Sequence, residues 1–172
     1  MSENMSAEDV SVVLNEYFAE VEPIITKYNG VINKFIGDAV MAIFGEPIQD
    51  KNHAMNAVMC ANEMIEKVDE LQKKWLKEGK PKIEIGVGIN TGEAFVGNIG
   101  SELRLEYTVI GDMVNLASRI ESYNKVYKTR FLISSTTYEQ VRDIADVIKI
   151  SEVSIRGKAK RLNIYEVLRL VE

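Results

Sequence analysis

The apolar stretch 31–45 contains two charged residues, Lys34 and Asp38. Charged groups in apolar segments cost free energy unless a partner or ligand compensates them. A carboxylate held at a tight turn suits a hard cation such as Mg²⁺, which prefers oxygen ligands and phosphate. We therefore interpret Asp38 as a candidate metal ligand and Lys34 as a candidate contact to a polar ligand. The alternatives are a turn residue that bonds its own backbone and an edge-strand charge that discourages aggregation.

A second candidate pair, Asn115 and Arg119, follows Gly111 in a segment predicted to be helical. A spacing of four places both side chains on one helix face, near the N-terminal half. The free N–H groups and dipole of a helix start favour anions, and an arginine supplies a fork of donors for phosphate oxygens. The alternative is a solvated surface pair.

The segment 156–161, which begins at Arg156, forms a local cationic patch on a chain of formal charge -5. It is either a phosphate-facing loop or a solubilising turn.

The elements that must position these residues can be predicted from apolar spacing. Two β-prone runs around Gly37 and Asp38 predict a tight hairpin. Apolar residues at helical spacing predict a helix that begins at Ser6 and ends at Asn29-Gly30. Gly86 and Gly88 share one face of a predicted strand, where another backbone or a ligand can approach closely. The remaining predicted elements are a helix at 51–76, strands at 82–90, 93–99 and 106–110, a helix from 112, a strand at 131–134, a helix at 135–144, and strands at 146–155 and 162–168.

Composition is that of a globular protein, and we expect a single domain over residues 1–172. Hydrophobic residues make up 46% and charged residues 27%, and no global basic field favours nucleic acid or an anionic membrane. One cysteine, Cys60, excludes an internal disulfide. With no long apolar run and no signal peptide, we expect a cytoplasmic location without direct membrane contact, although a parent protein could be anchored through other parts.

Three motifs, taken together, resemble the catalytic domain of class III nucleotide cyclases of the bacterial adenylate cyclase type. They are Asn-Lys-Phe-Ile-Gly-Asp at 33–38, Ile-Asn-Thr-Gly at 89–92, and Tyr-Thr-Val-Ile-Gly-Asp-Met-Val-Asn-Leu-Ala-Ser-Arg at 107–119. The resemblance covers residues 1 to about 165. It implies a ferredoxin-like α+β sandwich, and it implies conversion of ATP to cyclic AMP and pyrophosphate at the interface of a head-to-tail dimer. The partner is then a second copy of the chain or a related cyclase domain.

The resemblance also implies a role for each candidate residue. Asp38 matches one of two carboxylates that hold a pair of Mg²⁺ or Mn²⁺ ions. Lys34 is similar to the lysine that reads the purine edge, and Thr108 is its partner in the pairing associated with adenine. One protomer would supply the metal carboxylates and the other the base-reading residues.

Three further positions are implied to contact the sugar and the phosphates. Asn115 and Arg119 match the residues that orient the ribose and stabilise the charged transition state. Arg156 stands where a triphosphate-binding lysine usually lies, a replacement that keeps the charge and changes the geometry.

The chain departs from the family pattern at its start. Members of the family open with a strand that carries the other metal aspartate and a phosphate-cradling turn, whereas this sequence begins at the first helix. We therefore expect a sandwich that lacks the first strand, with unpaired edges on the flanking strands. We also expect a rearranged or partner-completed fold, and weak or no cyclase activity of the chain alone. The alternatives are a non-catalytic nucleotide-binding or dimerisation module and a ferredoxin-like binding domain unrelated to nucleotides.

Overall fold

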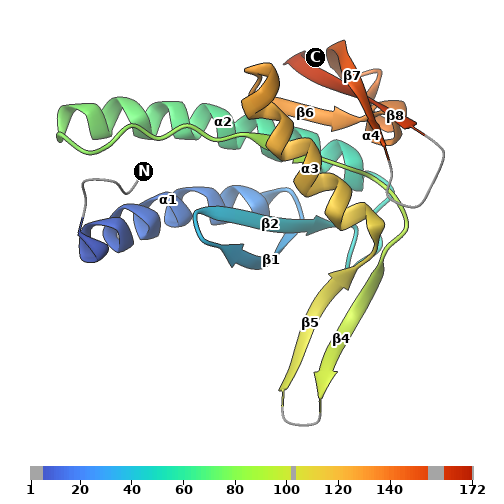
Figure 1. Cartoon of the computed structure of the whole chain (residues 1–172), viewed down its shortest axis with the longest axis horizontal. Helices are drawn as coiled ribbons and strands as arrows, with labels where there is room; N and C mark the ends of the chain where they lie inside the picture. Colours follow the sequence, from blue (N-terminus) through green and yellow to red (C-terminus); the bar gives the residue numbers. More distant parts are fainter. Residues whose placement is uncertain (1–5, 102–103, 155–160, 172) are drawn as a thin grey trace.

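The structure is a computed structural model that describes residues 6–101, 104–154 and 161–171. Helices and strands are mixed along the chain, which confirms the α+β class (Figure 1). In chain order the elements are α1 (Ala7–Lys27), β1 (Gly30–Ile36), β2 (Ala39–Phe44), α2 (His53–Lys77), β3 (Val87–Ile89), β4 (Phe95–Ser101), β5 (Arg104–Ile110), α3 (Asp112–Tyr127), β6 (Phe131–Ser134), α4 (Ser135–Val141), β7 (Ala145–Ser154) and β8 (Arg161–Leu170).

The described strands form three sheets. β1 pairs with β2, β4 pairs with β5, and a four-stranded sheet has the order β3-β6-β8-β7. In that sheet β3 runs parallel to β6, and the other pairs are antiparallel. Within the described ranges, β2 is paired only with β1, and β3 only with β6. Each of these strands therefore has one edge without a strand partner in the described ranges, and the expectation that such edges flank an absent first strand stays a prediction.

The two long helices pack side by side (Figure 1). α1 begins at the predicted cap, where the Ser6 hydroxyl accepts a hydrogen bond from the Asp9 N–H at 3.1 Å. It ends before Asn29, which adopts the left-handed conformation at φ 59°. The buried side of the pair includes Val21 of α1 and Trp75 of α2, both fully buried. The apolar stripes predicted for these helices thus form one of the cores of the molecule.

Glu16 of α1 forms ion pairs with residues at and just beyond the C-terminal end of α2. Its carboxylate lies 2.7 Å from the Lys74 ammonium of α2 and 2.5 Å from that of Lys80. The hydrogen bond from Lys74, followed by that from Lys80, lowers the pKa of Glu16 from 4.5 to about 2. Because the folded-state pKa is depressed, this contribution to stability is complete above the unfolded pKa and is lost as the pH falls towards 2.

We expect Glu16→Gln to lower the free energy of unfolding at pH 7, because both ammonium groups lose their charged partner. The deficit relative to the unsubstituted chain should shrink as the pH falls from 4.5 towards 2. Urea unfolding at a series of pH values measures this difference. Glu139→Gln, at an exposed position of α4, is the control. A deficit that stays constant across this pH range would contradict the assignment.

The hairpin predicted around Gly37 and Asp38 is confirmed as β1 and β2. Gly37 has a φ of 62°, a conformation that favours glycine. The pairing register shifts between Ile32 and Lys34, so Asn33 is left without a cross-strand partner at a β-bulge. Bulges bend a strand and redirect side chains, and they often lie next to functional sites.

The strand predicted at 82–90 is wrong over its first half, because only Val87–Ile89 is a strand. The segment is still placed by its apolar residues, since Ile83 is buried in the helix core. The Ile83 N–H donates to the side-chain oxygen of Gln72 on α2 rather than to a neighbouring strand. Alternation at 82–90 correctly indicated that Ile83 packs into a core, but it carried no information about strand pairing.

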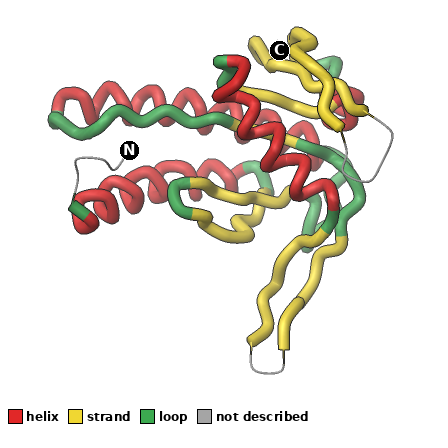
Figure 2. Tube along the Cα trace, viewed as in Figure 1, coloured by secondary structure: helices red, strands yellow, loops and turns green. Residues whose placement is uncertain are grey.

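β4 and β5 form a hairpin that projects away from the helices and the four-stranded sheet (Figures 1 and 2). It exposes large apolar side chains, among them Phe95 and Leu105, each 63% exposed. An exposed apolar surface of this kind is typical of interaction sites. The base of the hairpin leads directly into α3, so β5 and α3 together carry three of the candidate site residues.

Candidate active site

The position of α3 depends on a close approach between its backbone and that of β3 at Gly88. A Cβ added to Gly88 of β3 would lie 2.6 Å from Glu121 Cα and 2.8 Å from Ala117 O, too close for any side chain. This confirms that the glycine face of the predicted strand admits another backbone, here that of α3. α3 can therefore lie directly against β3.

Side-chain amides fix both ends of α3 to the region around β3. Near its start, Asn90 Nδ2 donates to Met113 O at 3.1 Å. Near its end, the buried Asn124 donates through Nδ2 to Val87 O at 3.0 Å and accepts from the Thr129 hydroxyl at 2.9 Å. Asn124 was not singled out in the sequence. Its only signal was an amide at a buried position of an amphipathic helix.

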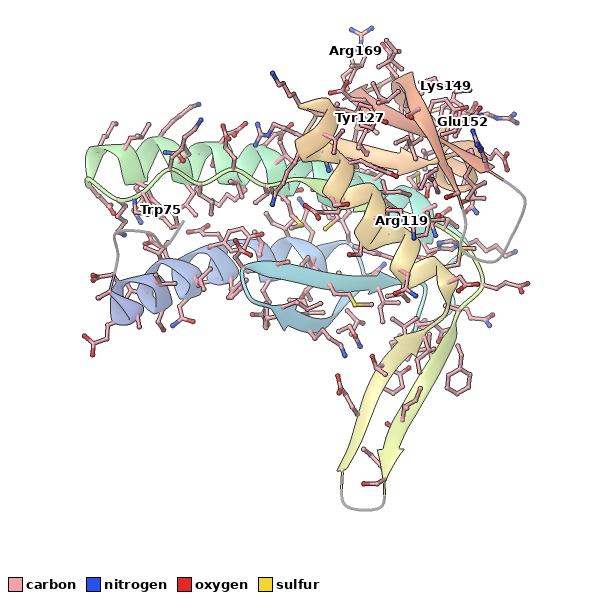
Figure 3. The ribbon with its side chains drawn as sticks, viewed as in Figure 1. Trp75, Arg119, Tyr127, Lys149, Glu152 and Arg169 are labelled. Atoms are coloured by element: carbon pink, nitrogen blue, oxygen red, sulfur yellow. The ribbon has the colours of Figure 1, made fainter. Side chains whose placement is uncertain are left out.

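Arg119 projects from α3 towards the end of β7 (Figure 3). Its Nη1 donates to the carbonyl oxygen of Ser154, the last residue of β7, at 2.7 Å. The basic segment 156–161 follows Ser154 in the sequence, and Arg156 lies outside the described residues. Asn115 is exposed one turn earlier on the same helix. The structure thus places a guanidinium group at the end of β7.

Lys34 and Thr108 are brought together at the contact between β1 and β5. Lys34 Nζ lies 2.5 Å from the carboxylate of Glu106. The Thr108 hydroxyl donates to Asn33 Oδ1 at 3.2 Å, and Asn33 Nδ2 donates to Tyr107 O at 3.1 Å. Sequence reasoning selected Lys34 and Thr108 but missed Asn33 and Glu106, because neither the bulge in β1 nor its contact with β5 can be read from local periodicity.

Asp38 is exposed at the turn between β1 and β2. Burial raises the pKa of Tyr17 to about 12, and the nearby negative charge of Asp38 adds to this effect. No hydrogen bond or ion pair in the described ranges joins Asp38 to the other candidate residues. Within the same ranges there is no group of three acidic, histidine or cysteine residues that could hold a metal ion. The described part of one chain therefore offers Asp38 as a lone carboxylate.

None of the described helices combines the length and the apolar character needed to cross a membrane.

Comparison with known proteins identifies the family. Residues 1–168 match the family described as the adenylate and guanylate cyclase catalytic domain. Among solved structures, the guanylyl cyclase Cya2 is 39% identical with a TM-score of 0.90, and the adenylyl cyclase CyaB from P. aeruginosa is 37% identical with a TM-score of 0.87. Each similarity covers 99% of this chain and 86% of the other.

Curated relatives include "Adenylate cyclase 1" of Rhizobium meliloti, 36% identical over 171 residues. The terminal-differentiation-specific adenylate cyclase of Dictyostelium discoideum is 43% identical over 171 residues. The matches cover 99% and 97% of this chain, but only 26% and 8% of the length of the relatives. The family match spans nearly the whole chain, and two structures of the same class superpose on it closely. The chain therefore belongs to the adenylate and guanylate cyclase catalytic domain family.

Proposed function

We propose that the chain is the catalytic domain of an adenylate cyclase, which converts ATP to cyclic AMP and pyrophosphate. The choice of base is supported by two hydrogen bonds across the contact of β1 with β5, from Lys34 to Glu106 and from Thr108 to Asn33, because they bring both residues to the same strand contact. An ammonium group beside a hydroxyl offers a donor and an acceptor to the edge of a purine. Fold similarity cannot make this choice, because both a guanylyl cyclase and an adenylyl cyclase superpose on the chain.

Asp38 would hold a divalent cation, Mg²⁺ or Mn²⁺, together with the phosphates of the nucleotide. Its carboxylate is exposed and fixed at a tight turn, and Mg²⁺ sites commonly use one or two carboxylates with substrate phosphates and water. The residues present fit one such ligand position. When bound, the cation would lower the pKa of the attacking 3′-hydroxyl and neutralise phosphate charge.

The reaction is the attack of the ribose 3′-oxygen on the α-phosphorus, with pyrophosphate as the leaving group. Asn115 would orient the ribose from the exposed face of α3. Arg119 would exchange its bond to Ser154 O for the phosphate oxygens, where its fork of donors matches the charge that develops during transfer. Arg156, two residues after Ser154 in the sequence, would bind the triphosphate.

The complete site would form between two copies in a head-to-tail pair. This arrangement is supported by the isolation of Asp38 within one chain, because no hydrogen bond or ion pair in the described ranges joins it to Lys34, Thr108 or Arg119. It is also supported by the exposed apolar residues of the β4–β5 hairpin, such as Phe95 and Leu105. Related structures show that domains of this family can pair and can bind a nucleotide: one is named as a non-canonical dimeric guanylyl cyclase domain, and another as a guanylate cyclase domain in complex with GTP.

An assay of the chain with ATP and Mn²⁺ tests the proposal. We expect cyclic AMP and pyrophosphate in equal amounts, no product after chelation of the metal, and a lower kcat/KM for GTP. The weak activity expected from the sequence stays a prediction, so the assay uses high chain concentrations and long incubations. Binding of ATP without any cyclic AMP would favour the non-catalytic module instead. The absence of binding to either purine nucleotide would refute the proposal.

A further inference from the structure

Asn33 occupies a special position beside the two base-reading candidates. It lies at the bulge of β1 and has no cross-strand partner there. Its half-buried side chain instead bridges to β5, donating to Tyr107 O at 3.1 Å and accepting from the Thr108 hydroxyl at 3.2 Å. The side-chain amide of Asn33 therefore bonds two consecutive residues of β5, one through its nitrogen and one through its oxygen.

The two bonds fix the direction of the Thr108 hydroxyl. A backbone carbonyl can only accept, so the amide nitrogen of Asn33 must face Tyr107 O. Asn33 Oδ1 then faces Thr108, and because this oxygen also only accepts, the threonine hydroxyl must donate to it. The hydroxyl hydrogen is thereby engaged, and the oxygen lone pairs of Thr108 remain available to accept from a ligand.

Lys34 presents the opposite polarity next to this acceptor. Its ammonium group only donates, and it is held at 2.5 Å by the carboxylate of Glu106. Adenine offers a donor at its exocyclic amino group, whereas guanine offers an acceptor at O6. The ring nitrogen beside that group is an acceptor in adenine and carries a hydrogen in guanine. A pair made of an accepting Thr108 and a donating Lys34 is therefore complementary to adenine and mismatched to guanine.

We propose that Asn33 is a positioning residue that sets the preference for adenine by orienting the Thr108 hydroxyl. This inference rests on the proposed function, in which Lys34 and Thr108 contact the base. Without Asn33, the hydroxyl is free to rotate and donate to guanine O6, so the base preference weakens even though neither base-reading residue changes.

The test compares ATP with GTP for the unsubstituted chain and for Asn33→Ala. We expect the ratio of kcat/KM for ATP to kcat/KM for GTP to be about tenfold lower in Asn33→Ala. This is the change expected from one mismatched hydrogen bond. Binding of the 3′-deoxy forms of both nucleotides with Mn²⁺ measures the same ratio without turnover, since these forms lack the attacking hydroxyl. Asn33→Asp keeps an acceptor towards Thr108, so it should retain most of the preference.

A double-mutant cycle separates this role from a general structural one. In a Thr108→Val background no hydroxyl remains to be oriented, so Asn33→Ala should produce no further change in the ratio. The matched control is Asn62→Ala on α2, an exposed amide bonded to Glu66, which should leave the ratio unchanged. A purely structural effect of Asn33→Ala would lower both kcat/KM values equally and would persist in the Thr108→Val background.

If Asn33→Ala fails to fold, hydrogen exchange of side-chain amide protons in the unsubstituted chain still tests the inference. The side-chain amide protons of Asn33 should exchange with solvent more slowly than those of the exposed Asn115, and their resonances should shift in Thr108→Val. Unprotected Asn33 protons would overturn the inference. The inference would also be overturned if the unsubstituted chain prefers ATP and the Asn33→Ala variant shows the same preference. A chain that neither binds nor converts purine nucleotides would instead refute the proposed function itself.

Discussion

Replacing Arg119 by alanine should lower kcat for cyclisation of ATP by about 10²–10³-fold, the usual effect of removing one preorganised donor from a developing charge. α3 holds the guanidinium rigidly, because the helix lies directly on Gly88 and is bonded at both ends through Asn90 and Asn124. Once nucleotide binding has drawn the guanidinium from Ser154 O to the phosphates, a fixed helix of this kind requires little further reorganisation when charge develops on them. KM should change much less than kcat, because the interaction strengthens mainly in the transition state.

Two variants control for the loss of an arginine. Arg119→Lys keeps the charge but loses the planar fork, so its kcat should fall between those of the unsubstituted chain and the alanine variant. Arg169→Ala removes an exposed arginine that is paired with Asp146 on the opposite strand, and it should leave kcat unchanged. Because Arg119 also bonds Ser154 O, the alanine variant should lose about 1 kcal/mol of stability. A folded Arg119→Ala variant with unchanged kcat would remove this residue from the site.

Local signals in the sequence were sufficient for the helices and for the first hairpin. Ser6 as a cap, the apolar stripe of α1 and the turn at Gly37 each depend on neighbours within a few residues. The segment 82–90 was predicted less well, because strand pairing depends on distant partners. Of its alternating apolar residues Ile83 is buried and the others are half-buried, yet Ile83 bonds a helix side chain rather than a strand.

The candidate site residues could be proposed from sequence motifs, but the hydrogen bonds that connect them could not. The motif at 33–38 and that at 107–119 contain Lys34 and Thr108, yet these positions are far apart in the sequence. The structure brings them together through Asn33 and Glu106, and this contact depends on the bulge in β1. A bulge reflects the whole arrangement of the hairpin against β5, so no local pattern indicates it. Arg156 lies outside the described residues, and its role stays a prediction.

The second large effect is the recovery of cyclic AMP synthesis that we expect when two nearly inactive variants are mixed. In a head-to-tail pair, one cleft takes Asp38 from one copy and Arg119 from the other, and the second cleft reverses the contributions. Asp38→Ala and Arg119→Ala should each have little activity, because every cleft of either pair lacks one residue. A mixed pair has one cleft with both residues intact and one with neither.

The mixing experiment tests the central claim, that two copies share each nucleotide cleft. At equal concentrations random pairing gives mixed pairs in half of the dimers, each with one complete cleft, so activity should recover to about a quarter of the unsubstituted value. Sedimentation of the mixture establishes that pairs form. Recovery of cyclic AMP synthesis to that level is the predicted result. If the variants pair and the mixture is no more active than its two components measured separately, the shared cleft is contradicted.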